Sequence, residues 1–542
     1  MIEKLFFLFL ISTSFLFALA YLRLSLHRFQ QAGYRANRYI NRLFEGPTGL
    51  FYHDRGPLNL GAALFFAILV LNTNSFDSVL GTFGEVVGAF LIFGFAWISY
   101  QRLVVLPKQE KKPLVFTSRV VRLYAVSLFL VFLCFVFMIR WRIEIAYALA
   151  PFLAVTIPIW FLAAHFLLVP LETQISRFYL RDAAKKRREL STLRVIGITG
   201  SYGKTSVKHA IEHVLSQKYL TLMTPGSINT ELGIARIIRE QLKRIHEVFI
   251  AEMGAREIGD IHRCCEVAQP QYGVITTIGT AHLEMFGSQE NILKTKSELA
   301  RYIPNDGVCF LNADNEFTPR IASEVKCKVV TFGIQNSDAD IRGADLTVTS
   351  KGTEFNVYIA GVDSPLKCRT ALLGSHNIVN VLAAIAVAVE FGIDLKTLER
   401  AVATLKPVQH RLALIDRGNG ILVIDDAFNS NPVGFREAIK VLSEFKDMRK
   451  ILVTPGMVEL GQSEFEENKE AAKFAAKYCD YIVLVGSAGR VHPLKVGLKE
   501  AGFAADRCFE ASSLAQAQAH LATYNKPGDI ILFENDLPDL YQ

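Results

Sequence analysis

The pattern of apolar and polar positions divides the chain into two parts that meet near residue 190. In the first part, long apolar runs with few charges occupy residues 5–22, 58–71, 79–100, 123–139 and 146–171. A helix needs about 20 such residues to cross the hydrocarbon core of a bilayer. We therefore predict about five transmembrane helices, of which the run at 58–71 is the shortest.

The second part has a different pattern, in which short apolar runs alternate with amphipathic stretches whose apolar residues recur at helical spacing. The strand-like runs lie at residues 193–199, 248–252, 272–277, 308–312, 421–425, 451–455, 481–486 and 529–533. Residues 328–372 are richer in short alternating strands, and residues 205–217 and 375–391 have the pattern of helices. This alternation predicts an α/β fold with a largely parallel sheet.

A break in composition at residues 405–411, which includes Pro407, separates two α/β series. We therefore expect a membrane region at residues 1–180, a basic linker at 181–192, a central domain at 193–405 and a Rossmann-like C-terminal domain at 406–542.

The charge is unevenly distributed. Residues 1–190 carry 21 lysines and arginines against 10 acidic residues, whereas the whole chain has a net charge of +7. The basic excess thus belongs to the apolar part, which is typical of membrane topology, and we expect no nucleic-acid partner. The eight cysteines form no C-x-x-C pair, so we expect free thiols in a reducing compartment.

The basic residues alternate between connecting loops. The first and third loops and the segment after the last run are rich in lysine and arginine, and the second and fourth are poor. Because basic loops remain in the cytoplasm, this pattern predicts a multi-pass protein of the cell membrane. Its N-terminus would be outside, and everything after residue 172 would be cytoplasmic. The rival interpretation, a signal peptide cleaved after Ala20, would place the second part outside.

The clearest chemical motif is Gly-Ile-Thr-Gly-Ser-Tyr-Gly-Lys-Thr-Ser at residues 197–206. A glycine-rich turn between a strand and a helix presents backbone N–H groups to phosphates. Lys204 can reach the β- and γ-phosphates, and the Thr205 hydroxyl can bind Mg²⁺. The strict P-loop pattern is not met, because Ile198 occupies the place of its first glycine. The predicted phosphate-binding residues are Gly200, Ser201, Tyr202, Gly203, Lys204, Thr205 and Ser206.

The form T-G-x-x-G-K-T resembles the Mur ligase family, the enzymes that add amino acids or peptides to cell-wall precursors. Further segments resemble motifs of the same family in the same order: residues 229–233, 251–260, 277–288, 294–298, 374–380, 425–432 and 456–461. The resemblance covers roughly residues 193–475, and the spellings are nearest to the branch that adds D-alanyl-D-alanine.

The resemblance implies an ATP-dependent ligase that converts a substrate carboxylate into an acyl phosphate, from which an amine displaces phosphate. It implies ATP and two Mg²⁺ ions as cofactors. Thr205 and Glu252 would hold the first ion, and His282 and a carbamylated Lys296 the second. Arg411 would touch phosphate when the domains close. Either Asn377 or Asn380 would reach adenine, and either Asp425 or Asp426 would accept from the ribose hydroxyls.

Two of these assignments also have a physical rationale. Glu252 ends an apolar strand, at the edge where α/β sheets bind ligands, and a carboxylate there can hold Mg²⁺. Lys296 is a poor metal ligand as a cation, whereas reaction with CO₂ would turn it into an anionic carbamate.

Two departures from the family bear on the substrates. The apolar helices occupy the place of the domain that binds the UDP-sugar, and residues 533–539 read Phe-Glu-Asn-Asp-Leu-Pro-Asp where the D-alanyl-D-alanine branch has a Lys-Gly-Ser segment. We therefore expect a cell-wall or lipid-linked carboxylate substrate, an amino acid or peptide amine, and membrane lipids as partners.

Three alternatives remain. The same chemistry could act on another polymer, such as a poly-amino acid. A P-loop ATPase coupled to transport is a different class, which the few polar residues of the apolar runs disfavour. A catalytically dead scaffold is disfavoured because Lys204, Glu252, His282 and Lys296 are all retained.

Overall fold

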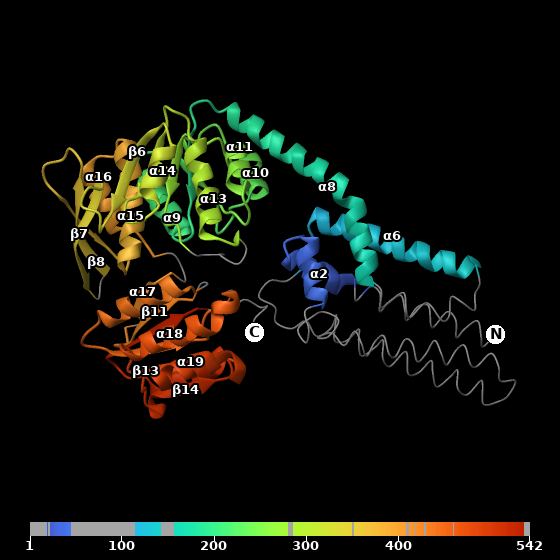
Figure 1. Ribbon diagram of the computed structural model, residues 1–542. Coiled ribbons are helices and arrows are strands. Elements are labelled where there is room, and N and C mark those ends of the chain that lie inside the picture. Colours follow the sequence, from blue (N-terminus) through green and yellow to red (C-terminus); the bar gives the residue numbers. More distant parts are fainter. Residues whose placement is uncertain are drawn as a thin grey trace. The chain divides into compact units, whose positions relative to one another are not determined.

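The computed structural model describes residue 19 and residues 22–44, 114–141, 157–279, 286–349, 352–407, 411–416, 418–427, 430–458 and 460–535. It divides into two compact units, Met1–Ser176 and Arg177–Gln542 (Figure 1). The predicted spans at 58–71 and 79–100, and almost all of that at 5–22, lie outside the described residues.

The named helices of the first unit are α2 (Ala36–Phe44), α6 (Ser118–Trp141) and the start of α8 (Ile157–Arg188). The predicted span at 123–139 lies within α6, and that at 146–171 overlaps α8. Among the described residues, α8 is the one helix found to be long and apolar enough to cross a membrane. The set of five spans therefore stays a prediction. Phe29, Tyr39 and Phe161 are fully buried and form the aromatic centre of this unit.

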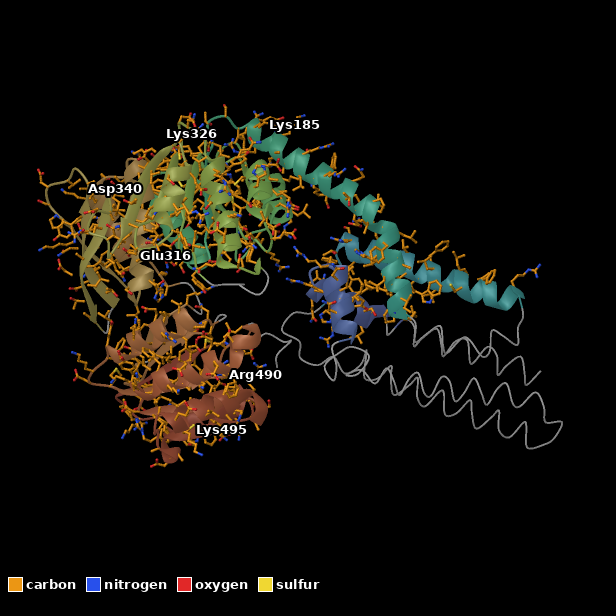
Figure 2. All side chains as sticks on the ribbon, in the orientation of Figure 1. Lys185, Glu316, Lys326, Asp340, Arg490 and Lys495 are labelled. Atoms are coloured by element: carbon orange, nitrogen blue, oxygen red, sulfur yellow. The ribbon has the colours of Figure 1, made fainter. Side chains whose placement is uncertain are left out.

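The last turns of α8 belong to the second unit and pack into its core. Ala183 is fully buried, and the Arg187 guanidinium donates to the carbonyls of Ala268 at 3.2 Å and Leu193 at 3.3 Å. Lys185, on the opposite side of the helix, is exposed (Figure 2). The segment 181–192, predicted as a linker, is thus helical as far as Arg188, and the buried Ala183 and Arg187 fix it to the domain.

A nine-stranded sheet forms the centre of the first α/β domain, with strand order β2-β3-β1-β4-β5-β6-β7-β8-β9. Strands β1 to β6 are parallel, β7 continues parallel to β6, and β7, β8 and β9 are antiparallel to one another. The strands are β1 (Arg194–Thr199), β2 (Thr221–Met223), β3 (Val248–Glu252), β4 (Tyr272–Ile275), β5 (Val308–Asn312), β6 (Lys328–Gly333), β7 (Ile341–Thr349), β8 (Gly352–Ile359) and β9 (Leu366–Thr370).

Helices cover both faces of this sheet, because its strands alternate apolar side chains between two cores. In β1, Ile196 and Ile198 join the core beneath α9, α15 and α16, whereas Val195 joins the core beneath α10, α11, α13 and α14. The helices are α9 (Lys204–Leu215), α10 (Glu231–Glu240), α11 (Asp260–Ala268), α13 (Gln289–Tyr302), α14 (Thr318–Glu324), α15 (Ser375–Glu390) and α16 (Leu395–Ala403).

The second α/β domain contains a six-stranded sheet of order β10-β11-β15-β12-β13-β14, in which only β10 is antiparallel to its neighbour among the described strands. Its strands are β10 (Ala413–Asp416), β11 (Leu422–Asp426), β12 (Arg449–Thr454), β13 (Tyr481–Val485), β14 (Cys508–Ala511) and β15 (Asp529–Glu534). Its α-helices are α17 (Pro432–Ser443), α18 (Glu464–Ala476), α19 (Ala488–Glu500) and α20 (Leu514–Tyr524). The predicted parallel α/β fold is confirmed.

The sheet order explains where a site can form. Strands β1, β3 and β4 are neighbours and run in the same direction. Their carboxyl ends therefore meet at one edge of the sheet, where ligands of open α/β folds bind. This arrangement brings the loop after β1 beside Glu252, at the end of β3, and Thr276, just after β4.

Candidate active site

The loop at residues 200–203 joins β1 to α9 and requires its glycines. Gly200 and Gly203 have φ angles of 151° and 81°, and a Cβ on Gly203 would lie 2.6 Å from Asn380 Oδ1. Gly203 is also the N-cap of α9, so no side chain there accepts from the first-turn N–H groups. This geometry provides the anion-binding helix terminus that the motif predicts.

The carboxyl end of β4 holds the loop in place. Thr276 Oγ1 donates to the Tyr202 carbonyl at 2.5 Å, and the Ser201 N–H donates to the Thr277 carbonyl at 2.7 Å. The Gly279 N–H donates to Ser201 Oγ at 3.0 Å. In this conformation the Ser201 side chain anchors the loop, and the loop's shape depends on contacts some 75 residues distant in sequence.

Lys204 lies across the loop. Its ammonium donates to the carbonyls of Gly200 at 2.7 Å and Ser201 at 3.2 Å. Burial lowers the pKa of Lys204 to about 8, an effect that the Glu252 carboxylate opposes and the Arg411 charge reinforces. The lysine predicted to bind phosphate therefore lies at the loop. Its hydrogen bonds to the two carbonyls can be exchanged for bonds to a phosphate.

Glu252 is almost fully buried and each of its carboxylate oxygens has a partner. Oε2 accepts from Thr205 Oγ1 at 3.0 Å and from Lys208 Nζ at 3.0 Å, and Oε1 accepts from Asn229 Nδ2 at 3.2 Å. The sequence predicted Thr205 and Glu252 as ligands of one Mg²⁺ ion, and the structure brings them into contact. A hydroxyl and a carboxylate beside a phosphate-binding loop are oxygen donors of the kind that Mg²⁺ prefers.

The second predicted metal site is described only in part. Lys296, on α13, is buried with 4% of its surface exposed. Burial, together with the nearby charge of Lys204, lowers its pKa to about 7. His282 lies at residues 280–285, outside the described part of the chain, so its role stays a prediction. The described residues contain no group of three or more His, Cys, Asp and Glu side chains able to hold a metal ion.

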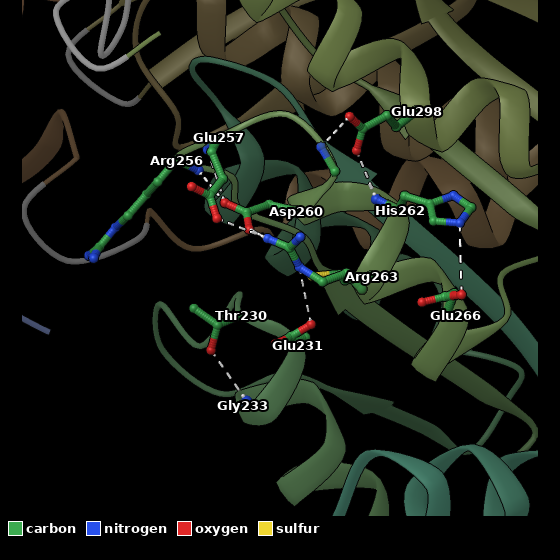
Figure 3. Close-up of polar contacts among 12 residues, drawn as sticks. Thr230, Glu231, Gly233, Arg256, Glu257, Asp260, His262, Arg263, Glu266 and Glu298 are labelled. Carbon is green, nitrogen blue, oxygen red and sulfur yellow. Dashed lines mark hydrogen bonds and ion pairs between the residues drawn. The ribbon is translucent and has the colours of Figure 1, made fainter. Parts of the chain in front are cut away.

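A network of polar contacts fixes the segment that follows Glu252 (Figure 3). The Asp260 carboxylate accepts from the backbone N–H groups of Arg256 at 2.7 Å and Glu257 at 3.0 Å. Glu298 accepts from the N–H groups of Gly259 at 2.7 Å and His262 at 2.9 Å, which ties α13 to the start of α11 (Figure 3). Glu298 thereby fixes α13, which carries Lys296, to the segment that follows β3 and Glu252.

A cavity of about 340 Å³ lies beside the loop, between α9 and α15. Asn377 and Asn380 both line it, and Asn380 Nδ2 donates to Asn377 Oδ1 at 3.4 Å. The remaining lining residues are Ser206, His209, Ala210, Glu212, His213, Leu372, Val381, Thr404, Leu405, Lys406 and Arg411. Both asparagines predicted for the adenine side thus face one cavity, and the choice between them stays open.

The predicted C-terminal residues lie at the end of β11 and just before β10. Burial lowers the pKa of the Arg411 guanidinium, and the negative charges of Asp426 and Glu252 act in the opposite direction. The guanidinium is therefore close enough to both carboxylates to interact with their charges. Asp426 accepts from the Leu412 N–H at 3.1 Å, and burial raises its pKa to about 6. Asp425 accepts from the Ala427 N–H at 3.2 Å. These backbone contacts do not decide which aspartate faces a ribose.

Sequence reasoning missed two residues of this site, Lys208 and Asn229. Lys208 follows Lys204 by four positions, so helical spacing places both on one face of α9. That spacing was the available signal. Asn229 begins the segment at 229–233 that resembles a family motif, but its spacing gave no indication that it binds Glu252.

A phosphate-binding loop at the carboxyl edge of a parallel sheet, with a buried glutamate against its threonine, defines a P-loop nucleotide-binding enzyme. Comparison with protein-family models identifies the family of this enzyme. The model of the Mur ligase middle domain matches residues 198–388, and that of the Mur ligase glutamate ligase domain matches residues 410–534. The chain belongs to the Mur ligase family. It is an ATP-dependent ligase that joins a carboxylate to an amine.

Individual relatives agree with this assignment. The UDP-N-acetylmuramoyl-tripeptide–D-alanyl-D-alanine ligase of Mycobacterium tuberculosis (strain CDC 1551 / Oshkosh) is 32% identical over 361 residues, which cover 63% of this chain and 70% of that protein. The Escherichia coli (strain K12) enzyme of the same name is 32% identical over 344 residues, covering 61% and 74%.

Solved structures give the same result. A crystal structure of MurF from Acinetobacter baumannii has a TM-score of 0.61 and 27% identity, and the match covers 68% of this chain and 78% of that one. MurF ligase from Thermotoga maritima in complex with ADP has a TM-score of 0.58 and 26% identity, with coverage of 66% and 80%.

Proposed function

We propose that this ligase joins an amino acid or peptide amine to the carboxylate of a cell-wall precursor at the cytoplasmic face of the cell membrane. The observation that carries the proposal is the contact of Glu252 with Thr205 at the P-loop, together with the buried Lys296 on α13. The names of the relatives suggest D-alanyl-D-alanine as the amine and a UDP-linked muramoyl tripeptide as the acid, and a lipid-linked acid is the variant that a membrane region favours.

In the first step, an oxygen of the substrate carboxylate bonds to the γ-phosphorus of ATP, and the bond from that phosphorus to the bridging oxygen breaks, which releases ADP. Lys204 leaves the Gly200 carbonyl to neutralise the phosphates. Thr205 and Glu252 would hold Mg²⁺, which would supply further charge neutralisation. In the second step, the amine nitrogen bonds to the carbonyl carbon, phosphate leaves with its oxygen, and the nitrogen loses a proton.

The finer part of the metal proposal concerns Lys296. A pKa near 7 leaves a large fraction of this amine neutral at physiological pH, and only the neutral form attacks CO₂. The reaction forms an N–C bond and releases one proton, so the product is an anionic carbamate. With His282, this carbamate would hold a second Mg²⁺ ion at the phosphates.

The membrane part of the proposal draws on the sequence and on α8. The spans predicted at 5–22, 58–71, 79–100, 123–139 and 146–171, with basic loops inside, anchor the enzyme as a multi-pass protein. Its N-terminus is then outside, both α/β domains are cytoplasmic, and lipids surround the spans. Residues before 198 precede both family models. In this proposal, the region that they form keeps the enzyme near a membrane-delivered acid.

The test is ADP release by the detergent-solubilised full chain, with mass spectrometry of the products. The proposal expects ADP formation that depends on both an acid and an amine, and a product lighter by one water than their sum. A product built on a poly-amino acid would favour the alternative substrate. ATP hydrolysis stimulated by a translocated solute, without an amide product, would overturn the proposal in favour of a transport ATPase.

A further inference from the structure

Lys208 is a lysine with no exposed surface, one turn of α9 beyond Lys204. Its ammonium lies 3.0 Å from Glu252 Oε2 and donates to the Gly226 carbonyl at 2.5 Å. A buried charge is costly unless it is paired, and these contacts supply the pairing. The proposed mechanism assigns this residue no step, so its position within the metal site needs another explanation.

The contact places the Lys208 ammonium on the same Glu252 oxygen that accepts from Thr205. Glu252 Oε2 accepts from both Lys208 Nζ and Thr205 Oγ1, while Oε1 accepts from Asn229 Nδ2. The carboxylate and the ammonium together carry no net charge. A bare divalent cation that approaches Glu252 therefore meets a neutral pair whose oxygens are already engaged.

Mg²⁺ gives up its water reluctantly and is usually held in proteins by one or two carboxylates together with substrate phosphates. With the charge of Glu252 neutralised, the attraction for Mg²⁺ must come from the negative phosphates of the nucleotide. If the lysine were absent, Glu252 would present a full negative charge in a buried site, where screening by solvent is weak.

We propose that Lys208 is a specificity-determining residue that keeps free divalent cations out of the Glu252 site, so that the metal enters with the nucleotide. The proposal rests on the assignment of Thr205 and Glu252 as Mg²⁺ ligands. Lys208 orients the carboxylate and offsets its negative charge, and it acts on the metal through Glu252.

The experiment titrates Mn²⁺, a paramagnetic substitute for Mg²⁺, into the full-length protein and measures free Mn²⁺ by electron paramagnetic resonance. Titrations are done with and without a non-hydrolysable ATP analogue. The wild type is expected to bind Mn²⁺ at this site only with the analogue. Lys208→Met is expected to bind Mn²⁺ without nucleotide at least about tenfold more tightly than the wild type. Adding Glu252→Gln is expected to abolish that gain.

Lys328→Met is the matched control, because Lys328 forms a Lys–Glu pair with Glu390 at 2.7 Å on the surface. This variant should bind Mn²⁺ as the wild type does. Equal Mn²⁺ affinity in Lys208→Met and the wild type would overturn the proposal. If Lys208→Met does not fold, the wild type decides alone: tight nucleotide-free Mn²⁺ binding that Glu252→Gln removes is the overturning result. A wild type that binds no Mn²⁺ even with the analogue would instead refute the proposed metal site.

Discussion

Thr205 and Glu252 lie 47 residues apart in sequence, yet the hydroxyl of one donates to the carboxylate of the other at 3.0 Å. The first belongs to the helix after β1 and the second ends β3, and parallel pairing of these strands brings both to one edge of the sheet. The contact has consequences for activity and for stability.

Replacing Glu252 tests both consequences. Glu252→Gln should lower Mg²⁺-dependent ADP formation by about 100-fold or more, because it removes the charge of the proposed metal ligand. Glu252→Ala should also lower the free energy of unfolding by about 3–5 kcal/mol, because it leaves the Lys208 ammonium buried and unpaired. Steady-state kinetics and chemical denaturation measure the two effects. Unchanged stability in Glu252→Ala would contradict the buried ion pair.

Gly203 should tolerate no side chain. Gly203→Ala places a Cβ 2.6 Å from Asn380 Oδ1 at a backbone φ of 81°, so the loop must shift and nucleotide affinity should fall at least tenfold, by about 1.4 kcal/mol or more. Fluorescence titration with an ATP analogue measures the affinity. Gly489→Ala is the control, because its Cβ would meet nothing within 4 Å, and it should bind as the wild type does.

Lys296 should carry a CO₂-derived carbamate. Lys296→Ala should lose activity and regain part of it with added short carboxylates, whereas Lys294→Ala, on the exposed side of the same helix, should remain active. Labelling with ¹³CO₂ should give a carbamate signal in NMR spectra that decreases below pH 7, because the protonated amine does not react. Full activity of Lys296→Ala would remove the carbamate from the mechanism.

Glu534 should make the protein less stable as pH rises. It is buried between Ser430 and Thr454, and burial raises its pKa to about 8. Between roughly pH 4.5 and 8 the folded state keeps a proton that the unfolded state has released, so the free energy of unfolding contributed by this group decreases with pH.

Glu534→Gln carries no such proton, so this variant should gain stability relative to the wild type between pH 5 and pH 8. Chemical denaturation at the two pH values measures the difference. The exposed Glu510→Gln serves as the control and should show the same difference from the wild type at both values. A wild-type advantage that grows with pH would contradict the protonated state.

The proposed membrane topology predicts on which side of the membrane the C-terminal domain lies. A green fluorescent protein fused after residue 542 should fluoresce in cells and sediment with membranes, because that domain folds to its fluorescent form in the cytoplasm. An alkaline phosphatase fusion at the same position should be inactive. An active phosphatase fusion would place the α/β domains outside and support the cleaved signal peptide instead.

Much of the local structure follows from short-range patterns. The runs predicted at 248–252 and 308–312 coincide with β3 and β5, and the helix predicted at 375–391 ends one residue after α15. These elements have strong periodicity, which depends on near neighbours alone. Strand β2 and strand β14, with three and four residues, were not predicted, because runs so short carry little periodic signal.

The sequence by itself determined the α/β class, and it predicted the phosphate-binding loop with Lys204, Thr205 and Glu252 as site residues, since a glycine-rich turn between a strand and a helix is a local feature. The tertiary structure decided which groups meet. It placed Asn380 beneath Gly203 and Lys208 on Glu252, contacts that depend on the order of strands in the sheet and on helix docking. Residues tens to hundreds of positions apart share no local pattern, so only packing can bring the buried Lys208 ammonium to Glu252.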